Sequence, residues 1–373
     1  MSVEETHRLL LHAAHRVVGA TWIEDLGYEV PRSFGDPASE QTAIATSVGL
    51  IDESYRGVVD LIGDGVAGAL EKIVSSTVGD LTPGHGHPSC LLSAKGRLVG
   101  AFHLFLLEGG TFRLVFREPL SEPVRTALER YLFLSDIEVV PQSDLALLAL
   151  QGPRAAEALR SWQPALRFPE ATHELVSAGD DVVLLRGGQT PQGGFELWVR
   201  VSALERVWCE LRDHVVAVGG SPVGQEATEA LRVEAGLARA GKEYTVESFP
   251  NEVGWEPALK YDKCYVGQEV VARMRTYGQV HQKLKGLILG GPTLPAVGAV
   301  VQVDGQDVGV VTSAVSSERL GRPIALALIK RKAWSAERAT VVAPEAPLEA
   351  GMIELPFVPV EKSGRTFPDK PVS

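Results

Sequence analysis

The 373-residue chain has little cysteine and no excess of positive charge. Its three cysteines, Cys90, Cys209 and Cys264, are too few and too scattered for a disulfide framework, and no CxxC pair is present to hold zinc or a cluster. A small, odd number of cysteines is typical of a reducing compartment. The 36 Lys and Arg against 47 Asp and Glu give a formal net charge of −11. This charge argues against a protein that coats nucleic acid with its whole surface.

Long apolar runs are also absent. No run approaches the roughly 20 residues that a helix needs to cross a bilayer. Glu4 and Glu5 stand where a secretory signal would carry positive charge, and charged residues interrupt the apolar positions that follow. We therefore expect a cytoplasmic protein with no membrane partner.

What the chain does contain is enough apolar sequence for large cores, with 45% hydrophobic and 22% charged residues. Helical and strand patterns are mixed without regular βαβ alternation, which favours an α+β fold. Two apolar runs joined by Ala94-Lys95-Gly96 predict a hairpin, since Gly96 permits a positive φ. The Gly-, Pro- and acid-rich residues 22–42 read as a surface loop. After Lys283, short apolar strands separated by Gly, Pro and Asp predict a small β-barrel or sandwich.

The segment with the most unusual chemistry is residues 259–286. Cys264 lies beside Lys263 and shortly before a predicted short helix that starts near Gln268. A cation and a helix N-terminus both stabilise a thiolate, so a reactive thiol is one interpretation. The alternative is a cysteine packed as a small hydrophobic residue. Between Lys260 and Lys285, six Lys and Arg against two acids give a local charge of +4, which fits an anionic ligand or a solvated face.

Other candidate motifs are weaker. His85, His87 and His103 lack identifiable further ligands, so we predict no metal site. The glycine-rich segment before Glu196 leads into a strand, which excludes a phosphate-binding loop. Arg232 and Glu234 lie near a helix end at Gly236, where a structural ion pair is the simplest interpretation.

Several segments, in order, resemble the folate-binding family of the glycine cleavage T-protein, and specifically its YgfZ-like branch. Together they cover about residues 40–330, and KCYVGQE, residues 263–269, is the most discriminating because it is similar to the signature of that branch. The matching segments are VGLIDESYRGVVDLIGDG, LLSAKGRLVGAFHLF, LALQGPRAAEAL, GGFELWV, LRVEAGLARAGKE, KCYVGQE and VGVVTSAVSSERLGRPIALALI.

The resemblance implies a three-domain ring around bound tetrahydrofolate, with a C-terminal β-barrel. It implies a folate-binding core over 1–282, made of 1–54 with 142–240 and of 55–141 with 241–282, followed by a barrel over 283–373. It also assigns a chemical role to Cys264 and folate contacts to five residues: Glu196, Arg232, Tyr265, Gln268 and Thr77.

Two departures from the family pattern bear on catalysis. The family's Asn-Asp-Val is here Ser76-Thr77-Val78, and a threonine cannot act as a general base at neutral pH. The family's Arg-Thr-Gly-Tyr-Thr-Gly is here Arg186 to Pro191, with Gln189 in place of the aromatic residue.

Three functions stay open at this point. The resemblance implies an accessory protein for iron–sulfur cluster assembly or repair that binds tetrahydrofolate or a derivative, affects tRNA modification, and has iron–sulfur proteins or their assembly machinery as partners. The alternative is an aminomethyltransferase or another folate-dependent one-carbon transferase. The third is a binding module that uses the basic 260–285 strip without folate.

Overall fold

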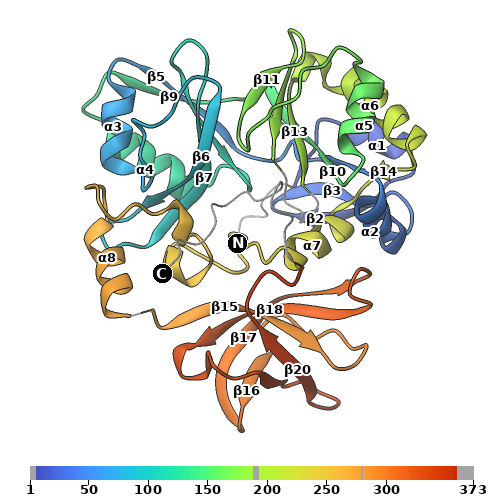
Figure 1. The fold of residues 1–373 in the computed structure, drawn as a ribbon, viewed down its shortest axis with the longest axis vertical. Helices are drawn as coiled ribbons and strands as arrows, with labels where there is room; N and C mark the ends of the chain where they lie inside the picture. Colours follow the sequence, from blue (N-terminus) through green and yellow to red (C-terminus); the bar gives the residue numbers. More distant parts are fainter. Residues whose placement is uncertain (1–5, 188–192, 279, 359–373) are drawn as a thin grey trace. The chain divides into compact units, whose positions relative to one another are not determined.

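A computed structural model describes residues 6–187, 193–278 and 280–358 (Figure 1). The chain forms two compact units, each built from separate stretches of sequence. Unit 1 contains the described residues up to Val58 together with Gln142–Arg232, and unit 2 contains Val59–Pro141 and the described residues from Val233 onward. The domain boundaries implied by the resemblance stay a prediction.

Unit 1 is built around a six-stranded sheet with the order β11-β12-β13-β10-β4-β14. The pairs are antiparallel except for β14 with β4. The strands are β4 (Gly49–Asp52), β10 (Leu145–Gln151), β11 (Leu175–Ser177), β12 (Val182–Arg186), β13 (Gly194–Arg200) and β14 (Ser221–Pro222). The helices are α1 (His12–Val17), α2 (Pro37–Thr46), α5 (Ala155–Trp162), α6 (Leu204–Ala217) and α7 (Gln225–Glu234), whose last two residues belong to unit 2.

Helices cover both faces of this sheet (Figure 1). On one face, Leu148 and Leu197 pack with Leu159 of α5 and Trp208 of α6 in the largest core of the unit. On the other face, a second core joins strands β4 and β10 to α2 and α7; it consists of Ile44, Ile51, Ala149, Val223, Ala227 and Leu231. The near-continuous apolar sequence of β10 follows from burial on both faces.

The prediction of a surface loop over residues 22–42 is wrong. The segment contributes strands β2 (Thr21–Asp25) and β3 (Tyr28–Ser33) and the start of α2; β1 (His7–Arg8), from outside the segment, adds to β3 in a small sheet with the order β1-β3-β2. The turn between β2 and β3 places Leu26 and Gly27 at positive φ, 56° and 78°. Asp36 caps α2 by accepting a hydrogen bond from the Ser39 amide. Asp36 is therefore a capping residue, whereas Glu29 lies within β3 and Glu40 is buried in α2.

Unit 2 contains a five-stranded sheet with the order β6-β7-β8-β5-β9 and helices α3 (Val66–Ile73), α4 (Glu122–Leu132) and α8 (Gln268–Tyr277). The strands are β5 (Val58–Gly63), β6 (His85–Leu92), β7 (Leu98–Leu106), β8 (Phe112–Phe116) and β9 (Ile137–Pro141). The predicted hairpin is confirmed: β6 and β7 pair antiparallel, and Gly96 in their turn has a φ of 72°.

The predicted C-terminal barrel is confirmed as a closed six-stranded barrel with the order β15-β18-β17-β16-β19-β20. Its strands are β15 (Gln282–Leu289), β16 (Val300–Val303), β17 (Gln306–Ser317), β18 (Arg322–Lys330), β19 (Arg338–Val341) and β20 (Leu348–Ile353). Along β18, Ala325 and Ala327 face the barrel core, whereas Ile324 and Leu326 pack against residues of the β6–β7 hairpin and the segment before α8. Burial of both faces explains why this strand is apolar between its exposed ends, Arg322 and Lys330.

In the part of the chain that the structure describes, no helix is both long enough and apolar enough to cross a lipid bilayer.

Candidate functional site

Glu196 lies on β13, on the face of the sheet opposite to α5 and α6. Its neighbours Phe195 and Leu197 belong to the core formed with those helices. Because side chains alternate along a strand, Glu196 projects from the other face. There it is paired in register with Ala149 of β10, a residue of the core that contains α2 and α7.

A buried arginine binds the carboxylate of Glu196. Nη1 of Arg56 lies 3.1 Å from Oε2 of Glu196 and 2.6 Å from Oε2 of Glu53. The exposed fractions of the three side chains are 2% for Arg56, 2% for Glu53 and 11% for Glu196. Burial works to lower the pKa of Arg56, but the two carboxylates outweigh it and raise that pKa above the ordinary arginine value. These three residues, the Arg56 cluster, carry two negative charges and one positive charge.

Arg232 lies on α7, on the same side of the sheet as Glu196. Its helix neighbour Leu231 packs in the core with Ala149 and Ile51. The guanidinium forms a bidentate pair with Glu229, with Nε–Oε2 and Nη2–Oε1 distances of 2.8 Å. The expected partner Glu234 instead accepts a hydrogen bond from Ser317 of the barrel. Residues three apart share a helix face and residues two apart do not, which explains why Arg232 pairs with Glu229 and not with Glu234.

Cys264 lies in an exposed loop just before α8. Two other predicted site residues, Tyr265 and Gln268, hold this loop in place. Tyr265 is buried among the apolar residues of unit 2, and its hydroxyl makes no hydrogen bond to any described residue. Burial raises the pKa of Tyr265 above its usual value. Nε2 of Gln268 donates to the carbonyl of Tyr261 over 3.1 Å. Of these three residues, Cys264 is the exposed one.

Lys263 connects this loop to the segment that contains Thr77. Its Nζ donates to the carbonyl of Ser76 over 2.6 Å and lies 2.9 Å from Oε1 of Glu71. Although burial works to raise the pKa of Glu71, hydrogen bonds from Lys263 and the Val78 amide lower it below the usual value. The positive charge of Lys263 is therefore paired with the carboxylate of Glu71. Cys264 also precedes Gly267, the N-cap of α8, by three residues, beyond the first turn in which a helix dipole acts.

His87 is the polar partner of Thr77. Its Nε2 lies 2.9 Å from the Thr77 carbonyl oxygen, which only accepts hydrogen bonds, so Nε2 carries the proton and Nδ1 is unprotonated in the neutral ring. Nδ1 is buried without a partner among the described residues. Burial lowers the pKa of His87, which favours this neutral form.

Most of the cations in the 260–285 strip are paired with carboxylates. Lys283 and Lys285 both contact Glu354, Arg273 contacts Glu269, and Lys263 contacts Glu71. The Arg275 guanidinium lies 4.5 Å from the centre of the Tyr261 ring. Glu71 and Glu354, which lie outside the strip, therefore offset about half of the local charge of +4 that the sequence indicates.

The six predicted site residues divide between the units: Glu196 and Arg232 belong to unit 1, and Thr77, Cys264, Tyr265 and Gln268 belong to unit 2. Of the segment that departs from the family's Arg-Thr-Gly-Tyr-Thr-Gly, residues 188–191, including Gln189, lie outside the described residues. Over the described ranges, no group of three or more His, Cys, Asp or Glu side chains is placed to hold a metal ion.

Sequence reasoning missed the Arg56 cluster and the contact of His87 with Thr77. A signal for the first was present, because Glu53 and Arg56 are charged residues three apart within the mostly apolar segment 48–63. Nothing in the sequence pairs His87 with Thr77, since that contact depends on the register of β6 with its neighbours.

Comparisons with known proteins agree with this architecture. Residues 11–263 match the GCVT N-terminal domain, and residues 282–359 match the glycine cleavage T-protein C-terminal barrel domain. The chain is 31% identical to an aminomethyltransferase of Rubrobacter xylanophilus over 94% of each protein. It is 30% identical to an aminomethyltransferase of Streptomyces coelicolor, over 88% of this chain and 91% of that protein.

A solved structure shares the fold. The glycine cleavage system aminomethyltransferase T from Bartonella henselae superimposes with a TM-score of 0.87, at 23% identity over 95% of this chain and 99% of that chain. The resemblance is confirmed at the level of the family, and the YgfZ-like branch stays a prediction. This protein belongs to the glycine cleavage T-protein family.

Proposed function

We propose that the protein binds tetrahydrofolate and acts as a one-carbon transferase of the aminomethyltransferase type. The observation that carries the proposal is the similarity, over nearly the whole chain, to proteins named aminomethyltransferase. It favours this function over the iron–sulfur accessory role that the resemblance to the YgfZ-like branch implied.

The chemistry of Glu196 fits a folate ligand. Its Oε2 is bound by Arg56, whereas Oε1 makes no hydrogen bond to the described residues. The pterin of tetrahydrofolate presents an amino group and a ring N–H, which a carboxylate can accept. We assign folate contacts to Glu196 and Arg232, with Tyr265, Gln268 and Thr77 as further candidates. The folate supplies the nitrogen that accepts the one-carbon unit.

Because position 77 is a threonine, the proposal predicts only a low rate of one-carbon transfer. Proton transfer by a positioned acid or base contributes about 100- to 10,000-fold to a reaction, and Thr77 cannot supply it. We therefore expect slow transfer by the natural protein.

A titration with tetrahydrofolate tests the ligand and the Glu196 assignment together. We expect Glu196→Ala to weaken binding about 10-fold or more, because a hydrogen bond to a charged group is lost. Glu205→Ala, which removes an exposed carboxylate on α6, is the matched control and should bind like the natural protein. If the natural protein binds no tetrahydrofolate, or if Glu196→Ala binds equally well, the proposal is wrong.

A turnover assay tests the transferase step. Formation of methylene-tetrahydrofolate from an aminomethyl-lipoyl carrier should rise about 100-fold in Thr77→Asp. Thr77→Asn has nearly the same shape without the charge and should stay at the level of the natural protein. Folate binding without turnover in any of the three proteins would contradict the transferase assignment and leave the folate assignment standing.

The second candidate function is the iron–sulfur accessory role, with effects on tRNA modification. The exposed Cys264 and the missing acid at Thr77 favour it. It predicts that Cys264→Ala fails to complement a strain that lacks this protein, whereas Cys209→Ala complements it. Full complementation by Cys264→Ala would exclude this candidate.

A further inference from the structure

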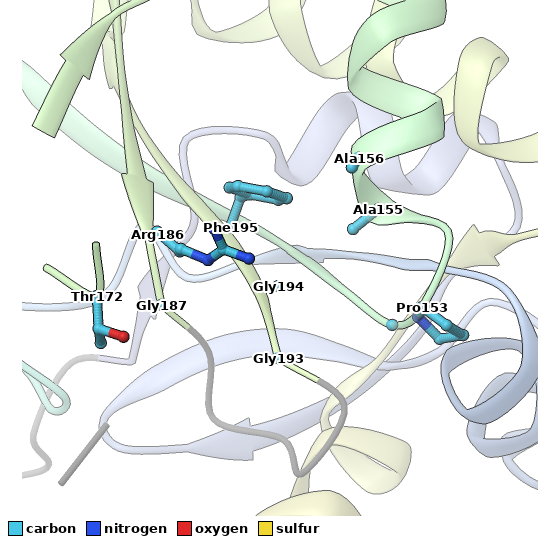
Figure 2. A pocket seen from close by; sticks show the side chains of 10 residues that line it. Pro153, Ala155, Ala156, Thr172, Arg186, Gly187, Gly193, Gly194 and Phe195 are labelled. Atoms are coloured by element: carbon cyan, nitrogen blue, oxygen red, sulfur yellow. The ribbon is translucent and has the colours of Figure 1, made fainter. Parts of the chain in front are cut away.

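Unit 1 contains a pocket of about 140 Å³ at one end of the six-stranded sheet (Figure 2). It is lined by the end of β12, the start of β13, the turn from β10 into α5, and Thr172. Phe195 contributes its ring, and Phe195 belongs to the core formed with α5. Since Glu196 projects from the opposite face of β13, this pocket is separate from the proposed folate contact at Glu196.

Arg186 is the one charged side chain on the described wall of the pocket. Figure 2 shows its guanidinium reaching from β12 toward Phe195 and the start of α5. Its Nη1 donates to the carbonyls of Pro169 and Glu170 at 3.2 and 3.3 Å, which fix the side chain but do not neutralise its charge. It forms no ion pair with a carboxylate among the described residues. Three of its five guanidinium N–H groups thus make no hydrogen bond to the described part of the chain.

The other described residues of the wall are neutral and mostly apolar. Pro153, Ala155, Ala156 and the Phe195 ring supply apolar surface, and Thr172 supplies a hydroxyl that makes no hydrogen bond to the described residues. The remaining lining residues are glycines, which present only backbone. The Phe195 ring is held edge-on by Phe168, with the ring centres 5.4 Å apart. A cavity of about 150 Å³ is large enough for a benzene-sized ring.

We propose that this pocket binds a small organic acid, with its carboxylate on Arg186 and its apolar part against Phe195 and Ala156. A guanidinium pairs with a carboxylate through two parallel hydrogen bonds, and this geometry favours Arg over other donors. The size of the pocket limits the apolar part to about one six-membered ring.

Benzoate is a suitable probe, and benzamide is its uncharged counterpart of the same shape. In a ligand-observed NMR titration of the full chain, we expect saturable benzoate binding and benzamide binding at least about 10-fold weaker. Arg186→Gln should weaken benzoate binding about 10-fold, because the charge is lost. Ala156→Leu should weaken it at least as much by filling the pocket, with Arg186 intact.

Two control variants locate the effect. Arg160 is an exposed cation on α5 that lies 4.8 Å from the Phe168 ring and does not line the pocket, so Arg160→Gln should bind benzoate normally. Glu196→Ala should also bind it normally, which separates this pocket from the folate contact. Thermal unfolding of each variant verifies the fold; if Arg186→Gln does not fold, Ala156→Leu and benzamide decide the outcome.

The proposal is overturned by any of three results. The first is no saturable benzoate binding, and the second is equal affinity for benzoate and benzamide. The third is unchanged binding in a folded Arg186→Gln or Ala156→Leu variant, because the bound benzoate would then lie elsewhere.

Discussion

At the scale of single residues, the Arg56 cluster is the most consequential feature of the structure. Arg56 is the cation shared by two carboxylates, Glu53 and Glu196, and removing it would leave both in a buried site. Breaking a buried ion pair by removing one partner costs about 3–5 kcal/mol. We predict that Arg56→Met lowers the unfolding free energy, measured in urea, by about this amount.

Arg125→Met is the matched control for Arg56→Met. Arg125 also contacts two carboxylates, Glu122 and Glu129, but it lies on the exposed face of α4. Solvent screens such pairs, so we expect no measurable change in stability. Equal effects of the two substitutions would contradict the role assigned to burial.

The three cysteines differ in environment. Cys264 is exposed, Cys209 is half-buried and Cys90 is buried, and burial raises the pKa of the Cys90 thiol far above its usual value. Because the thiolate is the species that reacts, we predict that iodoacetamide at neutral pH alkylates Cys264 at least about 100-fold faster than Cys90. A time course by peptide mass spectrometry measures both rates, and Cys264→Ala should remove the fast phase. Comparable rates for Cys90 would show that this part of unit 2 opens readily.

At the scale of elements, the end of α7 is joined to strand β17 of the barrel by Glu234. Its Oε1 accepts a hydrogen bond of 2.5 Å from Ser317, and its Oε2 is buried without a partner among the described residues. Burial raises the pKa of Glu234 above its usual value, so folding favours the protonated acid. The stability that this acid contributes is complete below about pH 4.3 and is lost as the pH rises through the folded-state pKa.

Glu234→Gln should therefore gain stability relative to the natural protein between about pH 4.5 and pH 8, in urea unfolding curves. Glu354→Gln should show the opposite trend. Burial works to raise the pKa of Glu354, but hydrogen bonds from Lys285 and Lys283 lower it, so its ionised form stabilises the fold at higher pH. The same trend in both variants would contradict the environment assigned to Glu234.

Helices and strands were predictable from the sequence where apolar residues recur with a regular period over a sufficient length. The β6–β7 hairpin and the barrel were found because apolar strands are separated by clear turn residues. The strands within 22–42 were missed because β3 carries Pro31 and the turn before it is rich in polar residues, so the local pattern is that of a loop. The strands are fixed by the antiparallel pairing of β2 with β3, to which β1 adds from about twenty residues away.

At the scale of the whole molecule, charge opposes binding to nucleic acid. The net charge is −11, and four of the six cations in the 260–285 strip are paired with carboxylates. We predict no saturable binding of a labelled 20-nucleotide RNA below about 100 µM at 0.15 M salt, measured by fluorescence anisotropy. Tighter, salt-dependent binding that is lost on neutralising Lys260 and Arg275 would favour the third function considered above.

The sequence by itself determined the family, the order of most elements and the presence of a C-terminal β domain, which the resemblance identified as a barrel, because these depend on periodicity and on motifs read along the chain. The tertiary structure decided which charges meet. It placed Arg56 between Glu53 and Glu196, bound Lys263 to Glu71, and left Arg186 on a pocket wall without an acidic partner among the described residues. Whether a charge near Cys264 or Glu196 is free or already neutralised depends on strand register and loop packing. These join residues as far apart as 56 and 196, and no local pattern encodes them.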